Sequence, residues 1–105
     1  MPTSNEEFER RHVHSIMAWV YILQSIQYGS YYIGSTTDDK KRIKQHINGK
    51  VKSTKNLRPL EVKLVQKYKT NILARRIEKK LKALKRKDYI DKIVREGLIK
   101  MKLPL

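Results

Sequence analysis

The sequence contains no cysteine. This absence excludes disulfide bonds, cysteine-ligated zinc, iron–sulfur clusters and catalysis by a thiol. It also means that cysteine usage does not indicate whether the protein works in an oxidising or a reducing compartment. No apolar run approaches the roughly 18–20 residues that cross a membrane, and the acidic N-terminus is unlike the basic start of a signal peptide. We therefore expect a soluble cytoplasmic protein without a membrane partner.

Acidic residues are also scarce, because 10 Asp and Glu stand against 25 Lys and Arg in 105 residues, which gives a net charge of +15. The imbalance is confined to one part of the chain: residues 1–39 sum to −3 and residues 40–105 to +18. Such a charge predicts binding to a polyanion or a membrane surface and says nothing about the fold. The length allows one domain with a modest core.

Hydrophobic patterning predicts three strands, at residues 18–25, 30–36 and 60–68, with a turn at 28–30 that pairs the first two as an antiparallel hairpin. A basic loop is expected over residues 50–60. Three helices are predicted: one that follows Thr37 and ends at Asn48-Gly49, one that is capped by Thr70 or Asn71 and runs to about Lys85, and one over residues 87–96. The order β-β-α-β-α-α favours a small α+β, or mixed α/β, domain.

The caps and apolar stripes of these helices follow from residue spacing. Thr37 is expected to cap the first helix, with Asp38 and Asp39 in its first turn. Ile43 and Ile47 are expected to face the core, and Arg42 and His46 lie four apart on the neighbouring stripe. In the later helices, the residues expected to pack inward are Leu73, Ile77, Leu81, Leu84 and Tyr89.

The polar residues 1–16 are interpreted as an N-terminal arm, residues 17–97 as the domain and residues 98–105 as a tail. Met17 is an alternative natural start, and the intact mass of the native protein would test it. We find no internal repeat.

Four residue types in the sequence suit phosphodiester hydrolysis, which needs an activated water, a cation beside the phosphate and often a carboxylate-held metal. Tyr21 and Tyr32 lie in two strands that should pair. Arg42 and His46 share a helix face directly after the second strand. Glu78 is one of only two acids between Asp39 and Asp88, and it falls about 100° from the centre of its helix's apolar stripe, at the border of the buried face.

These residues carry a resemblance. Residues 19–21 and 32–34, eleven positions apart, resemble the two signatures of the GIY-YIG nuclease family. Arg42, His46 and Glu78 then follow in the family's order. The sequence is most similar to small stand-alone members described as excinuclease-like or endonuclease-like. It shares further positions with them, namely Gly49-Lys50, Thr54, Arg58-Pro59 and the residues that follow Glu78. The resemblance spans roughly residues 17–95.

The resemblance implies a three-stranded antiparallel sheet flanked by helices, a one-metal active site and cleavage of a nucleic acid, DNA or alternatively RNA. It implies that Glu78 holds Mg²⁺ (or Mn²⁺), which binds through few carboxylates and many waters. By the same resemblance, Arg42 neutralises the transferred phosphate, and His46 assists a tyrosine or contacts a phosphate. Gly34 has a structural, backbone role that allows close approach. By the same resemblance, we expect a role in DNA repair.

By the same resemblance, Tyr21 or Tyr32 orients or deprotonates the attacking water. A free tyrosine has a pKa near 10, so a base role requires a lowered pKa. We expect the surrounding positive charge to lower it. The basic residues expected to contact nucleic acid are Lys41, Lys50, Lys55, Arg58, Arg75 and Lys82. Without a base-reading motif, specificity would come from DNA shape or from a protein partner.

The sequence departs from the family pattern at three positions. The first signature reads Trp19-Val20-Tyr21 and lacks its glycine. Ser35 stands where some members carry a lysine, and Ile90 stands where larger nucleases carry an asparagine.

Simpler interpretations remain open for several residues. Tyr21 and Tyr32 could be ordinary strand aromatics, His46 could pack beside Ile47, and Glu78 could form a surface ion pair with Lys82. For the whole protein, the alternatives are a nucleic-acid-binding module that has lost turnover and a basic protein of membranes or ribosomes.

Overall fold

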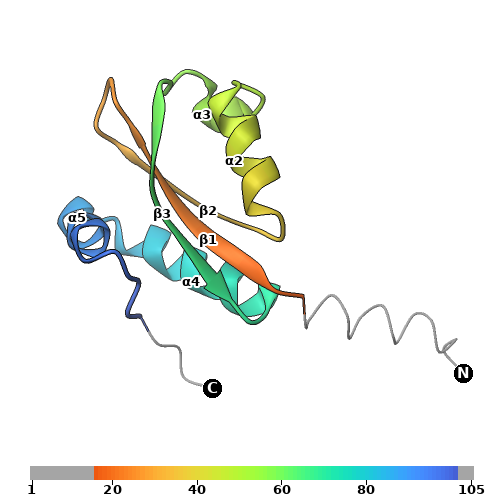
Figure 1. The fold of residues 1–105 in the computed structure, drawn as a ribbon. Coiled ribbons are helices and arrows are strands. Elements are labelled where there is room, and N and C mark those ends of the chain that lie inside the picture. Colours follow the sequence, from red (N-terminus) through yellow and green to blue (C-terminus); the bar gives the residue numbers. More distant parts are fainter. Residues whose placement is uncertain (1–15, 102–105) are drawn as a thin grey trace, which may run out of the picture.

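The structure is a computed structural model that describes residues 16–101. Three strands form one antiparallel sheet in the order β2-β1-β3: β1 spans Ala18–Ser25, β2 Tyr31–Thr36 and β3 Leu60–Tyr68. Helices α2 (Asp39–Ile47) and α3 (Lys52–Lys55) cover one face, and α4 (Asn71–Leu84) and α5 (Lys87–Glu96) cover the other (Figure 1). The predicted α+β class and the predicted order of strands and helices are confirmed, with α3 as an addition.

The apolar run of β1 follows from its central position in the sheet. The strand is hydrogen-bonded on both edges and covered by helices on both faces. Alternate residues of the strand point to opposite sides. Val20 and Ile22 pack toward α4 and α5, in a core that includes Ile77 and Ile93. Tyr21 and Leu23 point to the other face, toward α2 and α3, and both side chains are buried there.

Two predicted details of α2 are wrong. Asp38, and not Thr37, is the N-cap, because its carboxylate accepts a hydrogen bond from the Lys41 backbone N–H at 3.1 Å. Ile47 is 48% exposed, and the buried residue of this helix is His46. His46 can occupy the inward position, although it is polar, because Tyr21 and Thr54 hydrogen-bond to its ring nitrogens there.

The predicted basic loop is also wrong in part, because α3 forms within it. This turn begins at Val51, whose carbonyl accepts hydrogen bonds from the backbone N–H groups of Thr54 and Lys55. Thr54 is fully buried and bonds to His46, which ties the turn to α2.

In α4, Thr70 is the N-cap, as one of the two alternatives predicted. Ile77 and Leu81 are buried as expected, but Leu84 is 36% exposed and Ala74 takes the other inward position. Leu84 is the last residue of the helix, and Lys85 follows it in a left-handed conformation that redirects the chain. Tyr89 packs against the core as predicted, and Ile99, beyond α5, is buried in the same core.

Candidate active site

The Tyr21 side chain extends from the central strand β1 over the neighbouring edge strand β2. Its register partner is Gly34, so the two residues lie side by side on the face covered by α2 and α3. The Tyr21 side chain is buried, and a Cβ atom added at Gly34 would overlap the hydroxyl oxygen and the ring of Tyr21. The glycine therefore provides the space in which the tyrosine lies.

Gly34→Ala is expected to destabilise the fold by about 1–3 kcal/mol, because an overpacked site must displace its neighbours. The free energy of unfolding, measured in urea through Trp19 fluorescence, would show the loss. In a Tyr21→Leu background the same substitution should cost less, since the ring it displaces is gone. An equal cost in both backgrounds would contradict the assigned contact.

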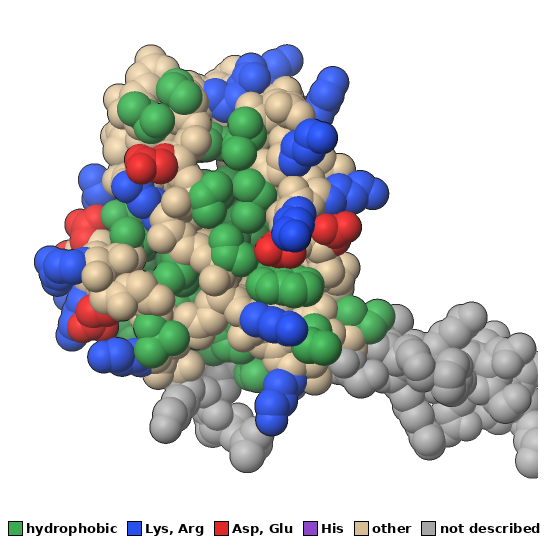
Figure 2. Space-filling view, viewed as in Figure 1, with side chains coloured by type: hydrophobic (Ala, Val, Ile, Leu, Met, Phe, Trp, Pro, Cys, Tyr) green, Lys and Arg blue, Asp and Glu red, His purple; other side chains and the backbone are tan. Residues whose placement is uncertain are grey.

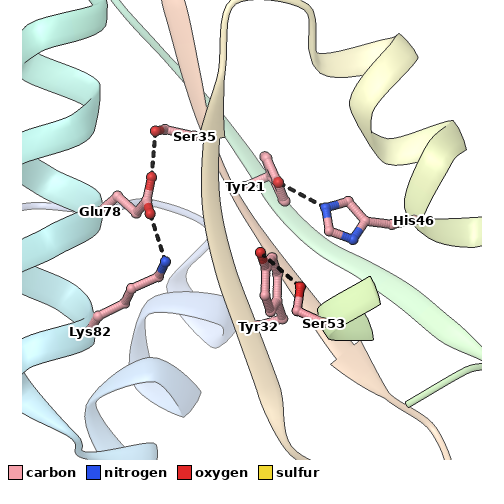
Figure 3. Close-up of polar contacts among 7 residues, drawn as sticks. All are labelled: Tyr21, Tyr32, Ser35, His46, Ser53, Glu78 and Lys82. Carbon is pink, nitrogen blue, oxygen red and sulfur yellow. Dashed lines mark hydrogen bonds and ion pairs between the residues drawn. The ribbon is translucent and has the colours of Figure 1, made fainter. Parts of the chain in front are cut away.

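His46 joins α2 to the central strand and to α3. One ring nitrogen, Nε2, lies 2.9 Å from the Tyr21 hydroxyl oxygen, and the other, Nδ1, lies 2.7 Å from the Thr54 hydroxyl oxygen. The imidazole is completely buried. Both ring nitrogens are therefore satisfied, and the ring orients the Tyr21 hydroxyl (Figure 3).

Burial, assisted by the positive charge of Arg42, lowers the pKa of His46 to about 4. The imidazole is therefore neutral near pH 7 in the folded protein. A neutral imidazole carries one N–H, so one ring nitrogen donates a hydrogen bond and the other accepts one.

Acid should destabilise the protein through His46. The unfolded chain takes up a proton at this residue below about pH 6.5, whereas the folded chain does so only near pH 4. The stabilising effect is complete above pH 6.5 and decreases as the pH falls, by about 2 kcal/mol at about pH 5. Urea unfolding at about pH 7 and about pH 5 would measure it, and His46→Gln should remove this part of the pH dependence. An unchanged pH dependence in that variant would contradict the buried neutral state.

Burial also raises the pKa of the Tyr21 phenol above its ordinary value, and the neighbouring Arg42 opposes this rise without cancelling it. The expectation of a lowered tyrosine pKa is therefore wrong for Tyr21. The loss of hydration outweighs the nearby positive charge. Tyr21 keeps its proton near pH 7 and acts as a neutral hydrogen-bonding group.

Tyr32 is the more accessible of the two tyrosines. Its ring lies 6.5 Å from that of Tyr21 and 5.0 Å from that of His46, measured between centroids. Its hydroxyl oxygen accepts a long hydrogen bond from Ser53 in α3, at 3.4 Å. Arg42, half-buried in α2, donates from Nη1 to the side-chain oxygen of Gln45 at 3.2 Å. Two tyrosines, a histidine and an arginine thus meet on this face.

Glu78 reaches the same edge strand from α4, on the opposite side of the sheet. The Ser35 hydroxyl donates a hydrogen bond to one carboxylate oxygen of Glu78, and the Lys82 ammonium lies 2.7 Å from the other. The carboxylate side chain is 21% exposed, as its position at the border of the buried face predicts. Lys82 also lies 5.7 Å from the centroid of the Tyr32 ring.

The candidate site thus lies on both sides of β2 (Figure 3). Tyr32 points to the α2 face, and Ser35, of opposite parity in the strand, points to α4. The ion pair between Glu78 and Lys82, which the sequence offered as an alternative, is present. Glu78 also accepts the hydrogen bond from Ser35 of β2. Sequence reasoning did not find the contacts of Ser35, whose only signal is its place directly after Gly34.

The side chains around Glu78 limit the kind of metal ion that could bind there. No group of three or more His, Asp or Glu side chains able to hold a metal occurs within residues 16–101. Glu78 is a lone carboxylate. Mg²⁺ and ions like it often bind through one or two carboxylates and complete their shell with water and substrate phosphates. This residue therefore fits an ion of that kind and does not fit an all-protein cage.

The basic residues expected to contact nucleic acid lie on both helical layers. Arg75 and Lys82 belong to α4, and the others lie in α2, in α3 and in the loops that flank α3, namely Lys41, Lys50, Lys55 and Arg58. Figure 2 shows Lys and Arg side chains along the outer side of α2 and α3. Ile90, the third departure noted from the sequence, is 5% exposed and packs in the core.

The fold and this set of side chains define a small nuclease-type α+β domain. Residues 17–91 match the family described as the GIY-YIG catalytic domain. Because the match covers most of the chain, the protein belongs to the GIY-YIG family. No curated protein matches the chain in a sequence search. No helix within residues 16–101 is long and apolar enough to cross a membrane.

Proposed function

We propose that this protein is a divalent-metal-dependent endonuclease that hydrolyses DNA phosphodiester bonds. The observation that carries the proposal is the meeting of Tyr21, Tyr32, Arg42 and His46 at one edge strand that Glu78 also contacts. Nucleases of the GIY-YIG family act on DNA, and the +15 charge suits a polyanion.

The residues are assigned complementary roles. Arg42 would neutralise charge that develops on the transferred phosphate. The Tyr32 hydroxyl would hold the attacking water, since it is the more accessible phenol and its only hydrogen bond within residues 16–101, to Ser53, is long. Tyr21, protonated and oriented by His46, would donate a hydrogen bond at the same place in the His46 tautomer whose Nε2–H donates to the Tyr21 oxygen. When Glu78 holds Mg²⁺ or Mn²⁺, the ion supplies Lewis-acid stabilisation of the leaving oxygen.

The second candidate function is a nucleic-acid-binding module on the same fold. Two observations favour it: Glu78 is engaged by Lys82, and a core isoleucine stands at the position of the asparagine of larger nucleases. Such a module would bind DNA with an affinity that falls steeply with salt but would not cleave it.

Incubation of labelled single-stranded, duplex and branched DNA with Mg²⁺ or Mn²⁺ separates the two functions. The proposed nuclease should cut at least one substrate, and cleavage should stop in EDTA and in Glu78→Ala. Salt-dependent binding to all substrates without cleavage would overturn the nuclease and support the binding module. Equal cleavage by the wild type and Glu78→Ala would exclude the assigned site.

A further inference from the structure

A pocket of about 400 Å³ lies beside the candidate active site, where α4 meets α5. We name it the α4–α5 pocket; residues 30–33, 81–82 and 85–87 and Ile90 line it. Its volume falls within the range of small-molecule sites, about 300–1,000 Å³. Tyr32 and Lys82 belong to both the pocket and the candidate active site, so the two are continuous.

The pocket combines an apolar interior with a cationic rim. Ile33, Leu81 and Ile90 are each less than one-tenth exposed and form its floor. Tyr31 and Tyr32 line the side formed by β2. The Tyr31 ring is held in place because its hydroxyl donates a hydrogen bond to Asp91 of α5 at 2.5 Å.

Of residues 16–101, four basic residues and no acidic residue line the pocket. Lys82 and Arg86 are paired, with Glu78 and Asp88 respectively. Lys85 and Lys87 form no ion pair with a carboxylate of residues 16–101 and are exposed. These two ammonium groups are therefore available to a bound anion.

We propose that the α4–α5 pocket binds one unpaired nucleotide of the DNA strand whose neighbouring phosphate lies at the candidate active site. A planar base suits the apolar floor and the tyrosine side, and its phosphates suit Lys85 and Lys87. A nucleotide in a Watson–Crick pair cannot place its base in a pocket without leaving the stack. The inference rests on the proposed function and narrows its substrate to DNA with a single-stranded segment.

A smaller cavity on the other side of Glu78 is consistent with a strand that continues along the junction of β2 and α4. This cavity, about 220 Å³, is lined by Ala18 of β1, by residues 35–37 of β2 and the turn after it, and by Asn71 and Arg75 of α4. The two cavities flank Glu78 along one helix, since Arg75 precedes it by three residues and Lys82 follows by four.

Fluorescence anisotropy in EDTA tests the pocket without requiring cleavage. The probes are a short labelled duplex with a single-stranded overhang and the same duplex with an abasic overhang, which carries the same phosphates. The wild type should bind the overhang with bases about tenfold more tightly, because stacking contributes that order of affinity per base. Equal binding of the two probes would overturn the inference.

Two charge-matched variants locate the contact. Lys85→Gln/Lys87→Gln changes the pocket rim, and Lys79→Gln/Lys80→Gln removes the same charge from exposed positions of α4 outside the pocket. The first variant should bind the overhang probe about tenfold more weakly than the second. Equal losses would overturn the inference. Base-selective binding without any cleavage would overturn the proposed function alone, and cleavage without base selectivity would overturn the pocket alone.

Discussion

Glu78→Gln should lower the rate of DNA cleavage by about a hundredfold to a thousandfold and leave DNA affinity nearly unchanged. The substitution keeps the shape of the side chain and an oxygen that can accept the Ser35 hydrogen bond. It removes the negative charge that would attract a divalent ion. Single-turnover cleavage with saturating protein, beside anisotropy in EDTA, separates the rate from the affinity.

Glu61→Gln is the matched control for this experiment. The Glu61 side chain lies on β3, is 56% exposed and forms an ion pair with Lys63, and its substitution changes the net charge by the same amount. It should therefore affect cleavage no more than a surface charge does. If both variants retained the wild-type rate, Glu78 would have no part in catalysis and its ion pair with Lys82 would be only a surface contact, worth about 0.3–0.5 kcal/mol.

Arg42→Gln should lower the cleavage rate by about a hundredfold, with a smaller loss of affinity. Arg42 is half-buried beside Tyr21 and His46, so its charge acts where water is partly excluded. The same substitution should raise the pKa of His46, because the Arg42 charge is one cause of its decrease. The ¹H–¹⁵N NMR titration of His46 measures this second effect without any substrate.

Lys44→Gln serves as the control, since Lys44 is an exposed cation of the same helix. This variant removes the same charge but should change neither the cleavage rate appreciably nor the titration of His46. A loss of rate as large in Lys44→Gln as in Arg42→Gln would mean that the helix contributes only general positive charge. An unchanged His46 pKa in Arg42→Gln would contradict the effect of the Arg42 charge on the imidazole.

Strand positions were predictable because apolar and β-branched residues form short runs with turn residues between them. The bounds of β1 and β3 agree with those expected, and β2 begins one residue later than predicted. The end of α2 at Asn48-Gly49 was predictable for a similar local reason: Gly49 has a positive φ of 74°, which glycine adopts readily.

The inward face of α2 was not predictable from hydrophobicity. Apolar spacing favoured Ile47, but His46 is the buried residue because Tyr21 and Thr54 supply partners for both ring nitrogens. Those partners lie 25 positions before it and eight positions after it. Short-range periodicity holds no information about contacts of that kind.

The same limit applies to the direction of the tyrosine pKa. Net charge suggested a lower value, whereas the burial of Tyr21 raises it. Burial depends on the packing of α2 against this face of the sheet and on the absence of a side chain at Gly34, the neighbour of Tyr21 on the adjacent strand. The balance between desolvation and charge is decided by packing, and composition alone does not describe packing.

Residue types and their local spacing were enough to establish the strongly basic character, the absence of thiol chemistry, the order of the strands and the three longer helices, and the residues that resemble the GIY-YIG family. The packing of the folded chain is what brings Glu78 to Ser35, buries His46 against Tyr21 and opens a pocket beside Tyr32. Each of these requires segments distant in the chain to pack against the two faces of one sheet.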